Sequence, residues 1–323
     1  MTSVHVSPIE GLQNNPISHC ALWTAIVTPF NQDGSVDYSS LRNITLRQAS
    51  AGNGILLLGS TGEGLALTRQ EQLSIVEFVC NLSLDTFIMV AVGGANLLEQ
   101  SQWIEQCNSL AIDAYLLATP IYAKPGPVGQ TQWFTALLDI AKFPCMLYNV
   151  PSRSGVDIPV DTLKNVQSHP NCWAMKEASG DINKFLAYRQ HCPEVELYSG
   201  EDAMLPHLAP AGVKGLVSVC ANAWPEATHQ YVQRCLNDNS TKEFIDFPLW
   251  QNAVDALFSV ANPIPVKVLM HQQGTISHNT LRAPLTHLEL TDNHDIALFD
   301  KKIAQWLSNT LVNTEINNSL ETV

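Results

Sequence analysis

Short apolar runs rich in β-branched and aromatic residues recur roughly every 20 to 30 residues along the first two thirds of the chain, separated by stretches with helical periodicity. The strand candidates are residues 22–27, 54–58, 86–92, 114–118, 145–148, 172–177, 196–199 and 215–219. The helix candidates between them include residues 38–51, 69–84, 97–110, 129–141, 160–167 and 182–191, and Asp37 and Thr68 can cap the first two. Because an intervening helix returns the chain to the same edge of a sheet, this alternation predicts parallel strands.

Eight strand–helix units in about 220 residues predict an α/β protein of the (β/α)8 TIM barrel class rather than an open doubly wound sheet. Beyond Trp224 the pattern is helical, over residues 228–236, 243–260, 266–270 and 295–311. We therefore expect an N-terminal extension (1–19), a barrel that carries the chemistry (20–237), a C-terminal helical domain (238–312) and a polar tail that frays (313–323).

Composition excludes several classes of partner. The formal charge of −13 and the lack of a basic cluster argue against nucleic acid. No apolar run is long enough for a membrane span, and the N-terminus lacks the features of a signal peptide, so we expect a cytoplasmic protein. The eight cysteines form no CxxC pair and the ten histidines no HExxH motif, so we expect buried thiols and no metal site.

A barrel of this kind carries its chemistry on the loops that follow the strands, and two such loops are informative. GSTGEG follows the second strand; its glycines fit a tight turn or the close approach of a ligand, while Ser60 and Thr61 suit a carboxylate or a proton relay. It lacks the lysine of a phosphate-binding loop. ATPIYAKPG follows the fourth strand and carries Tyr122, which by itself is as easily explained by packing or an interface.

The sixth strand, CWAMKE, supplies a candidate nucleophile. Strand alternation puts Cys172, Ala174 and Lys176 on one face and Trp173, Met175 and Glu177 on the other, and we expect the small-residue face to line the barrel. Burial in apolar walls can lower the pKa of a lysine and so produce a reactive amine. The alternative is a buried ion pair with a neighbouring carboxylate.

The loop YNVPSRSG follows the strand before this lysine. Tyr148 is placed to exchange protons with whatever the amine attacks, and Arg153 can hold a carboxylate through two parallel hydrogen bonds. Either residue alone could be structural. On successive strands with Lys176, the three indicate a site for a small charged substrate.

GSTGEG, ATPIYAKP, YNVPSRSG and KEASGD, in this order, resemble the dihydrodipicolinate synthase/N-acetylneuraminate lyase superfamily of pyruvate-dependent class I aldolases, over residues from about 20 to 310. The resemblance implies that Lys176 forms an imine with pyruvate, without a metal or organic cofactor, and that Tyr148 relays protons with Ser60 and Tyr122. It implies that Tyr122 comes from the neighbouring subunit of a dimer within a homotetramer. Thr61 would bind the pyruvate carboxylate, and the backbone of Val217 would contact the pyruvate-derived part.

Arg153 favours the synthases within the superfamily, because these resemble YNVPSRxG and use the arginine for the carboxylate of L-aspartate 4-semialdehyde. The expected reaction condenses this aldehyde with pyruvate to 4-hydroxy-tetrahydrodipicolinate, in lysine and diaminopimelate biosynthesis. Two alternatives remain. One is a sialic acid lyase or another 2-keto-3-deoxy-sugar acid aldolase, and the other is a silent barrel that binds a keto acid as a regulator.

Three departures from the family pattern stand out. Ser60 replaces a common threonine, and Ile121 replaces a tyrosine that often packs across the dimer interface. At the feedback site for lysine, this chain offers Gly64, Leu65, Arg69, Asn96 and Gln100, of which Asn96 alone fits. A lost carboxylate and an added cation both disfavour an ammonium ligand, so we expect weak or absent inhibition by lysine.

Overall fold

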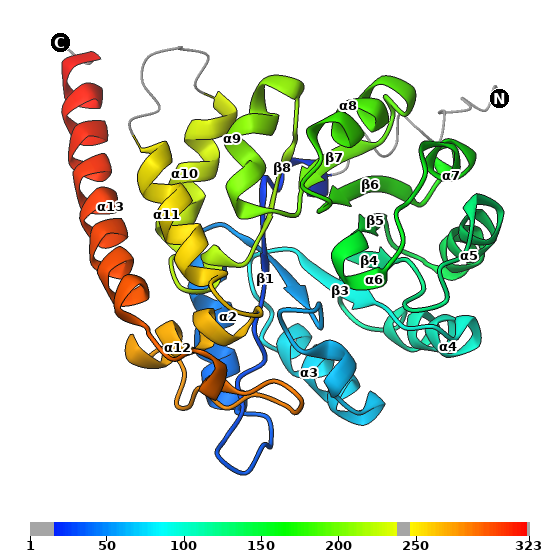
Figure 1. The fold of residues 1–323 in the computed structure, drawn as a ribbon, viewed down its shortest axis with the longest axis horizontal. Helices are drawn as coiled ribbons and strands as arrows, with labels where there is room; N and C mark the ends of the chain where they lie inside the picture. Colours follow the sequence, from blue (N-terminus) through cyan, green and yellow to red (C-terminus); the bar gives the residue numbers. More distant parts are fainter. Residues whose placement is uncertain (1–15, 238–245, 322–323) are drawn as a thin grey trace, which may run out of the picture.

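The computed structural model describes residues 16–237 and 246–321, with side chains up to residue 312. Eight parallel strands close into a barrel in chain order, β1 to β8, and β8 pairs with β1 (Figure 1). The expected TIM barrel is therefore confirmed. The strands are β1 Leu22–Ala25, β2 Gly54–Leu57, β3 Ile88–Val92, β4 Ala114–Ala118, β5 Cys145–Asn149, β6 Cys172–Glu177, β7 Glu196–Ser199 and β8 Gly215–Ser218.

Helices surround the strands and continue beyond them. They are α2 Tyr38–Ser50, α3 Arg69–Asn81, α4 Leu97–Cys107, α5 Pro127–Ile140, α6 Pro151–Ser154, α7 Val160–Val166, α8 Ile182–His191, α9 Leu205–Leu208, α10 Pro225–Asn237, α11 Phe247–Leu257, α12 Ile264–Gln272 and α13 His294–Glu321. The predicted caps are confirmed: Asp37 accepts from the amide of Ser40, and Thr68 forms a capping box with Glu71.

Two apolar layers hold the barrel together. Side chains that point inward from the strands form the first, which includes Trp23, Met89 and Met146. The opposite faces of the same strands pack under the helices and form the larger second layer, which includes Val90 and Leu147. The alternation of residues along each strand therefore decides which side chains line the barrel and which anchor the helices.

The first half of β6 differs from the expected alternation. Trp173 points into the barrel, where its ring centroid lies 6.3 Å from that of Trp23, while Cys172 joins the outer layer. The predicted faces of these two residues are wrong because the register with β5 shifts: Cys145 pairs with Cys172, but Met146 pairs with Ala174. This irregularity inserts one residue into β6 and leaves the faces of its second half as predicted.

The C-terminal helices lie along one side of the barrel, where α11 and α13 run beside each other (Figure 1). Trp250 of α11 and Trp306 of α13 meet edge to face, with ring centroids 5.2 Å apart. Helix α13 continues to Glu321, beyond the start of the expected polar tail at residue 313, and the fraying of this tail stays a prediction. The division of the chain into domains at residue 237 stays a prediction. In the described part of the chain, no helix is both long and apolar enough to cross a lipid bilayer.

Candidate active site

Lys176 and Tyr148 lie side by side near the ends of neighbouring strands. They are direct partners in the β5–β6 register, and the Nζ atom of Lys176 lies 4.3 Å from the centroid of the Tyr148 ring. Lys176 is buried, and among the side chains described no ion pair involves it. Within the described part of the chain, Lys176 therefore does not form the buried ion pair that was the structural alternative for it.

Gly200, directly after β7, makes room for the lysine side chain. A Cβ atom on this residue would lie 2.7 Å from Cε of Lys176 and 2.7 Å from Cβ of Ala178. Its amide donates to the carbonyl of Glu177 at 2.7 Å, which holds the loop against β6. Gly200 belongs to SGED, residues 199–202, a stretch that also resembles the superfamily, but the sequence alone indicates no role for this glycine.

Replacing Gly200 by alanine should therefore displace the amine. We expect Gly200→Ala to lower kcat by about 10²-fold, because a shift of about 1 Å in a reacting group can have that effect. Steady-state kinetics measures the loss. The matched control is Gly126→Ala, where a Cβ would meet no atom within 4 Å. Normal kinetics for Gly200→Ala would show that the lysine tolerates the added methyl group.

Arg153 lies on a single helical turn, α6, and the sequence explains where this turn begins and ends. Pro151 begins the turn with a preset φ, and Gly155 ends it in the left-handed region at φ 76°. Arg153 is exposed, and it lines a cavity of about 320 Å³ together with Ser60 and Tyr148. Three of the predicted site residues, from three different loops or strands, thus share one cavity.

The remaining predicted residues are placed differently. Thr61 is buried and does not line this cavity, although it follows Ser60 in the chain, and its Oγ1 accepts a hydrogen bond of 2.9 Å from the side chain of Asn262. Val217 lies in the inner layer of the barrel on β8. Tyr122 is 94% exposed, with φ 68°, and does not line the cavity. Within one subunit, the structure does not bring Tyr122 to Tyr148.

Two acidic residues that sequence reasoning did not single out follow Gly200. Burial raises the pKa of the Glu201 carboxyl, and Asp202 adds to the rise, while the charges of Lys176 and Arg153 oppose it. Glu201 is thus within electrostatic reach of both cationic site residues. Asp202 is buried and accepts from the amide of Val219 at 3.0 Å, which joins the loops after β7 and β8. The only local signal for these two residues in the sequence is the SGED stretch, residues 199–202.

Comparison with known proteins identifies the family. The model of the dihydrodipicolinate synthetase family matches residues 19–299, most of the chain. The chain belongs to this family. In its members, the reaction proceeds through an imine between a lysine and pyruvate, without an external cofactor. Among the described residues, no cluster of three or more metal-ligating side chains is found.

Relatives in the family match nearly their whole length. A 4-hydroxy-tetrahydrodipicolinate synthase from Francisella philomiragia is 50% identical over 287 residues, 89% of this chain and 97% of the relative. The enzyme of the same name from Wolbachia pipientis wMel is 45% identical over 286 residues, 88% of this chain and 96% of the relative.

Solved structures of the family agree with the fold. The crystal structure of dihydrodipicolinate synthase from Cyanidioschyzon merolae with lysine bound has a TM-score of 0.84 at 28% identity, over 89% of this chain and 99% of that one. The chloride-inhibited enzyme from Acinetobacter baumannii, complexed with pyruvate, has a TM-score of 0.81 at 29% identity, over 89% and 98%.

Proposed function

We propose that Lys176 is the imine-forming residue of a lyase that condenses pyruvate with L-aspartate 4-semialdehyde to 4-hydroxy-tetrahydrodipicolinate, in the biosynthesis of lysine and diaminopimelate. The main support is the position of the Lys176 amine. It is buried, forms no ion pair with a described carboxylate, and lies 4.3 Å from the centroid of the Tyr148 ring. Family membership and the names of the relatives support this reaction over the alternatives.

The reaction begins when the Lys176 amine attacks the ketone carbon of pyruvate. Loss of water gives a protonated imine, which withdraws electrons so that the methyl group loses a proton and becomes an enamine. The enamine carbon then attacks the aldehyde carbon of the second substrate. Tyr148 moves protons with Ser60, Thr61 holds the pyruvate carboxylate, and Arg153 holds the carboxylate of the aldehyde. The amino group from the aldehyde substrate then attacks the imine carbon of the bound adduct, which closes the ring as the bond between this carbon and the Lys176 nitrogen breaks and frees the lysine.

The identity of the aldehyde is tested by competition between substrates. We expect kcat/KM for aspartate semialdehyde to exceed that for N-acetylmannosamine, or for sugar aldehydes, by about 10³-fold or more, because a paired carboxylate is lost with the sugars. A preference for a sugar would indicate a sialic acid lyase or a related aldolase. Binding of pyruvate with no turnover of any aldehyde would indicate the silent regulator.

The fourth-strand loop supports a shared site in a homotetramer built as a dimer of dimers. Tyr122 is almost fully exposed on this loop, and the apolar side chains of Leu65 and Val128 are also exposed. Tyr122 then reaches the Tyr148 and Ser60 of a neighbouring subunit. Ile121 contributes apolar packing where a second tyrosine would stand.

Subunit complementation tests this sharing. Tyr122→Ala and Lys176→Ala chains are each expected to be nearly inactive, but when they assemble together about a quarter of the sites should work, since half of the dimers are mixed and each holds one complete site. Tyr122→Ala mixed with the Lys176→Ala/Tyr122→Ala chain is the control and should stay inactive. If the mixture is no more active than the two single variants measured separately, Tyr122 is not shared between subunits.

Inhibition by lysine is expected to be weak or absent. The guanidinium of Arg69 lies 4.5 Å from the centroid of the Trp103 ring and lines the cavity near Gln100, where its charge opposes an ammonium group. The side chain of Asn96, the one matching residue, accepts from the amides of Leu98 and Glu99 as a helix cap. A steady-state assay with half-maximal inhibition at low micromolar lysine would contradict this expectation.

We place the enzyme in the cytoplasm. All eight cysteines are free thiols, and seven of them are buried, as suits a reducing compartment.

A further inference from the structure

The loop between β2 and α3 carries two of the site residues, Ser60 and Thr61, on a backbone that needs support. Glu63 has φ 53°, in the left-handed region that side chains other than glycine rarely occupy. The loop also folds closely over the end of β2, because a Cβ on Gly64 would lie 2.0 Å from the carbonyl oxygen of Leu58. Something must therefore hold Glu63 in this conformation.

The carboxylate of Glu63 is held from two sides. Its Oε1 accepts from Nζ of Lys267 at 2.7 Å, and its Oε2 accepts from the amide of Arg282 at 2.7 Å. Lys267 is completely buried; its Nζ also donates to the carbonyl of Thr28 at 2.8 Å and lies 4.3 Å from the centroid of the Phe30 ring. Burial lowers the pKa of Lys267 to about 8, while Glu63 opposes this effect.

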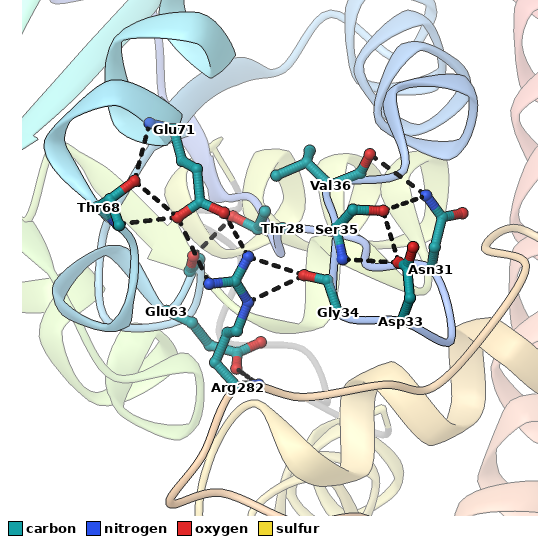
Figure 2. A network of polar contacts seen from close by, with 11 residues as sticks. Thr28, Asn31, Asp33, Gly34, Ser35, Val36, Glu63, Thr68, Glu71 and Arg282 are labelled. Carbon is teal, nitrogen blue, oxygen red and sulfur yellow. Dashed lines mark hydrogen bonds and ion pairs between the residues drawn. The ribbon is translucent and has the colours of Figure 1, made fainter.

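Arg282 extends the support to the neighbouring loops. Figure 2 shows its guanidinium between the carbonyl of Gly34, which accepts from Nη2 at 2.7 Å, and the carboxylate of Glu71 at 2.5 Å. Glu71 in turn accepts from the amide of Thr68 in the capping box of α3. The loop between β2 and α3 ends at Thr68, the cap of α3. Because Arg282 binds Glu71 in the first turn of α3, Arg282 also fixes this end of the loop.

The same C-terminal segment reaches the substrate residue directly. Asn262, just before α12, donates to Oγ1 of Thr61 at 2.9 Å. A hydroxyl that accepts this bond keeps its own proton for another partner, and in the proposed reaction that partner is the carboxylate of pyruvate. Residues 262–282, outside the eight strands, thus contact the loop at Thr61 and at Glu63.

We propose that Glu63 is a positioning residue for pyruvate binding: Lys267 and Arg282 hold its carboxylate, and this fixes the backbone that carries Ser60, which lines the cavity, and Thr61 beside it. The proposal rests on the proposed function. A buried ion pair is often no more stabilising than apolar residues of the same size, so stability alone does not account for this one. The ion pair is instead explained by its effect on the geometry of the loop that carries Ser60 and Thr61.

The test removes both charges together. In Glu63→Leu/Lys267→Met no buried charge is left without a partner, so we expect a folded enzyme with cooperative thermal unfolding. We expect kcat to fall about 10-fold and KM for pyruvate to rise about 10-fold. KM for aspartate semialdehyde should change less than about 2-fold, because Arg153 stands on a different loop. The matched control, Arg234→Met/Asp246→Leu, removes a 3.0 Å ion pair near α10 and α11 and should leave all constants unchanged.

A merely structural role would lower thermal stability, or the active fraction, without the change in KM for pyruvate. A folded double variant with wild-type kcat and KM overturns the proposal. Should that variant not fold, Glu63→Gln keeps the volume and one acceptor oxygen; a 3-fold or greater rise in KM for pyruvate supports the proposal, and an unchanged KM overturns it. If the wild-type enzyme forms no imine with pyruvate, the proposed function itself fails, which is a separate outcome.

Discussion

Lys176→Met should abolish turnover and leave the fold intact. Methionine cannot form an imine, so kcat should fall by at least about 10³-fold. Lys176 makes no ion pair among the described side chains, and methionine is of similar length, so the change breaks no ion pair, and Arg153 still acts on the Glu201 carboxyl. We therefore expect a melting temperature equal to or above that of the wild type. Steady-state kinetics and thermal unfolding measure the two effects.

The control is the other buried lysine. Lys267→Met leaves the Glu63 carboxylate buried without its partner, which should cost about 3–5 kcal/mol of stability. Lys176→Met should thus lose activity and keep its stability, whereas Lys267→Met should lose stability. Residual turnover above about 1% in Lys176→Met would contradict the role of Lys176.

Arg153→Ala should affect one substrate only. Loss of two charge-assisted hydrogen bonds should lower kcat/KM for aspartate semialdehyde by about 10²- to 10³-fold. KM for pyruvate should stay within about 2-fold, because Thr61 holds that carboxylate. The exposed arginine contributes little to folding, so the free energy of unfolding should change by no more than about 0.5 kcal/mol. Initial rates with each substrate varied in turn separate the two constants.

Arg153→Lys separates charge from geometry, since lysine keeps the charge and loses the planar fork, and it should recover only part of the loss. The matched control is Arg42→Ala, an exposed arginine on α2, which should leave both constants unchanged. An equal effect of Arg153→Ala on both substrates would contradict the assignment of the arginine to the aldehyde.

Much of the fold could be predicted from local patterns. The β-rich runs gave all eight strands to within two residues at each end, and Asp37 and Thr68 marked two helix starts. The faces of Cys172 and Trp173 could not be predicted, because an inserted residue in β6 depends on its pairing with β5. The sequence predicts a loop around Arg153, whereas the structure has a helical turn there, for which Pro151 and Gly155 are typical limits.

The candidate site was predictable only where a residue lies at the end of a strand or in the loop directly after it. Lys176, Tyr148 and Arg153 do, and periodicity with the barrel rule placed them together. Asn262 and Lys267 do not. They meet Thr61 and Glu63 across 201 and 204 positions of sequence, and no local pattern encodes such a contact. The space that Gly200 leaves for Lys176 likewise emerges only from the packing of neighbouring strands.

The most direct test of the imine at Lys176 is borohydride reduction of the wild-type enzyme in the presence of pyruvate, followed by mass mapping of its peptides. Reduction would convert the imine into a stable secondary amine on the lysine that forms it. We predict one pyruvate-derived adduct, on the peptide that contains Lys176, and none when pyruvate is omitted. No adduct, or an adduct on Lys267 or another lysine in place of Lys176, would contradict the proposed chemistry.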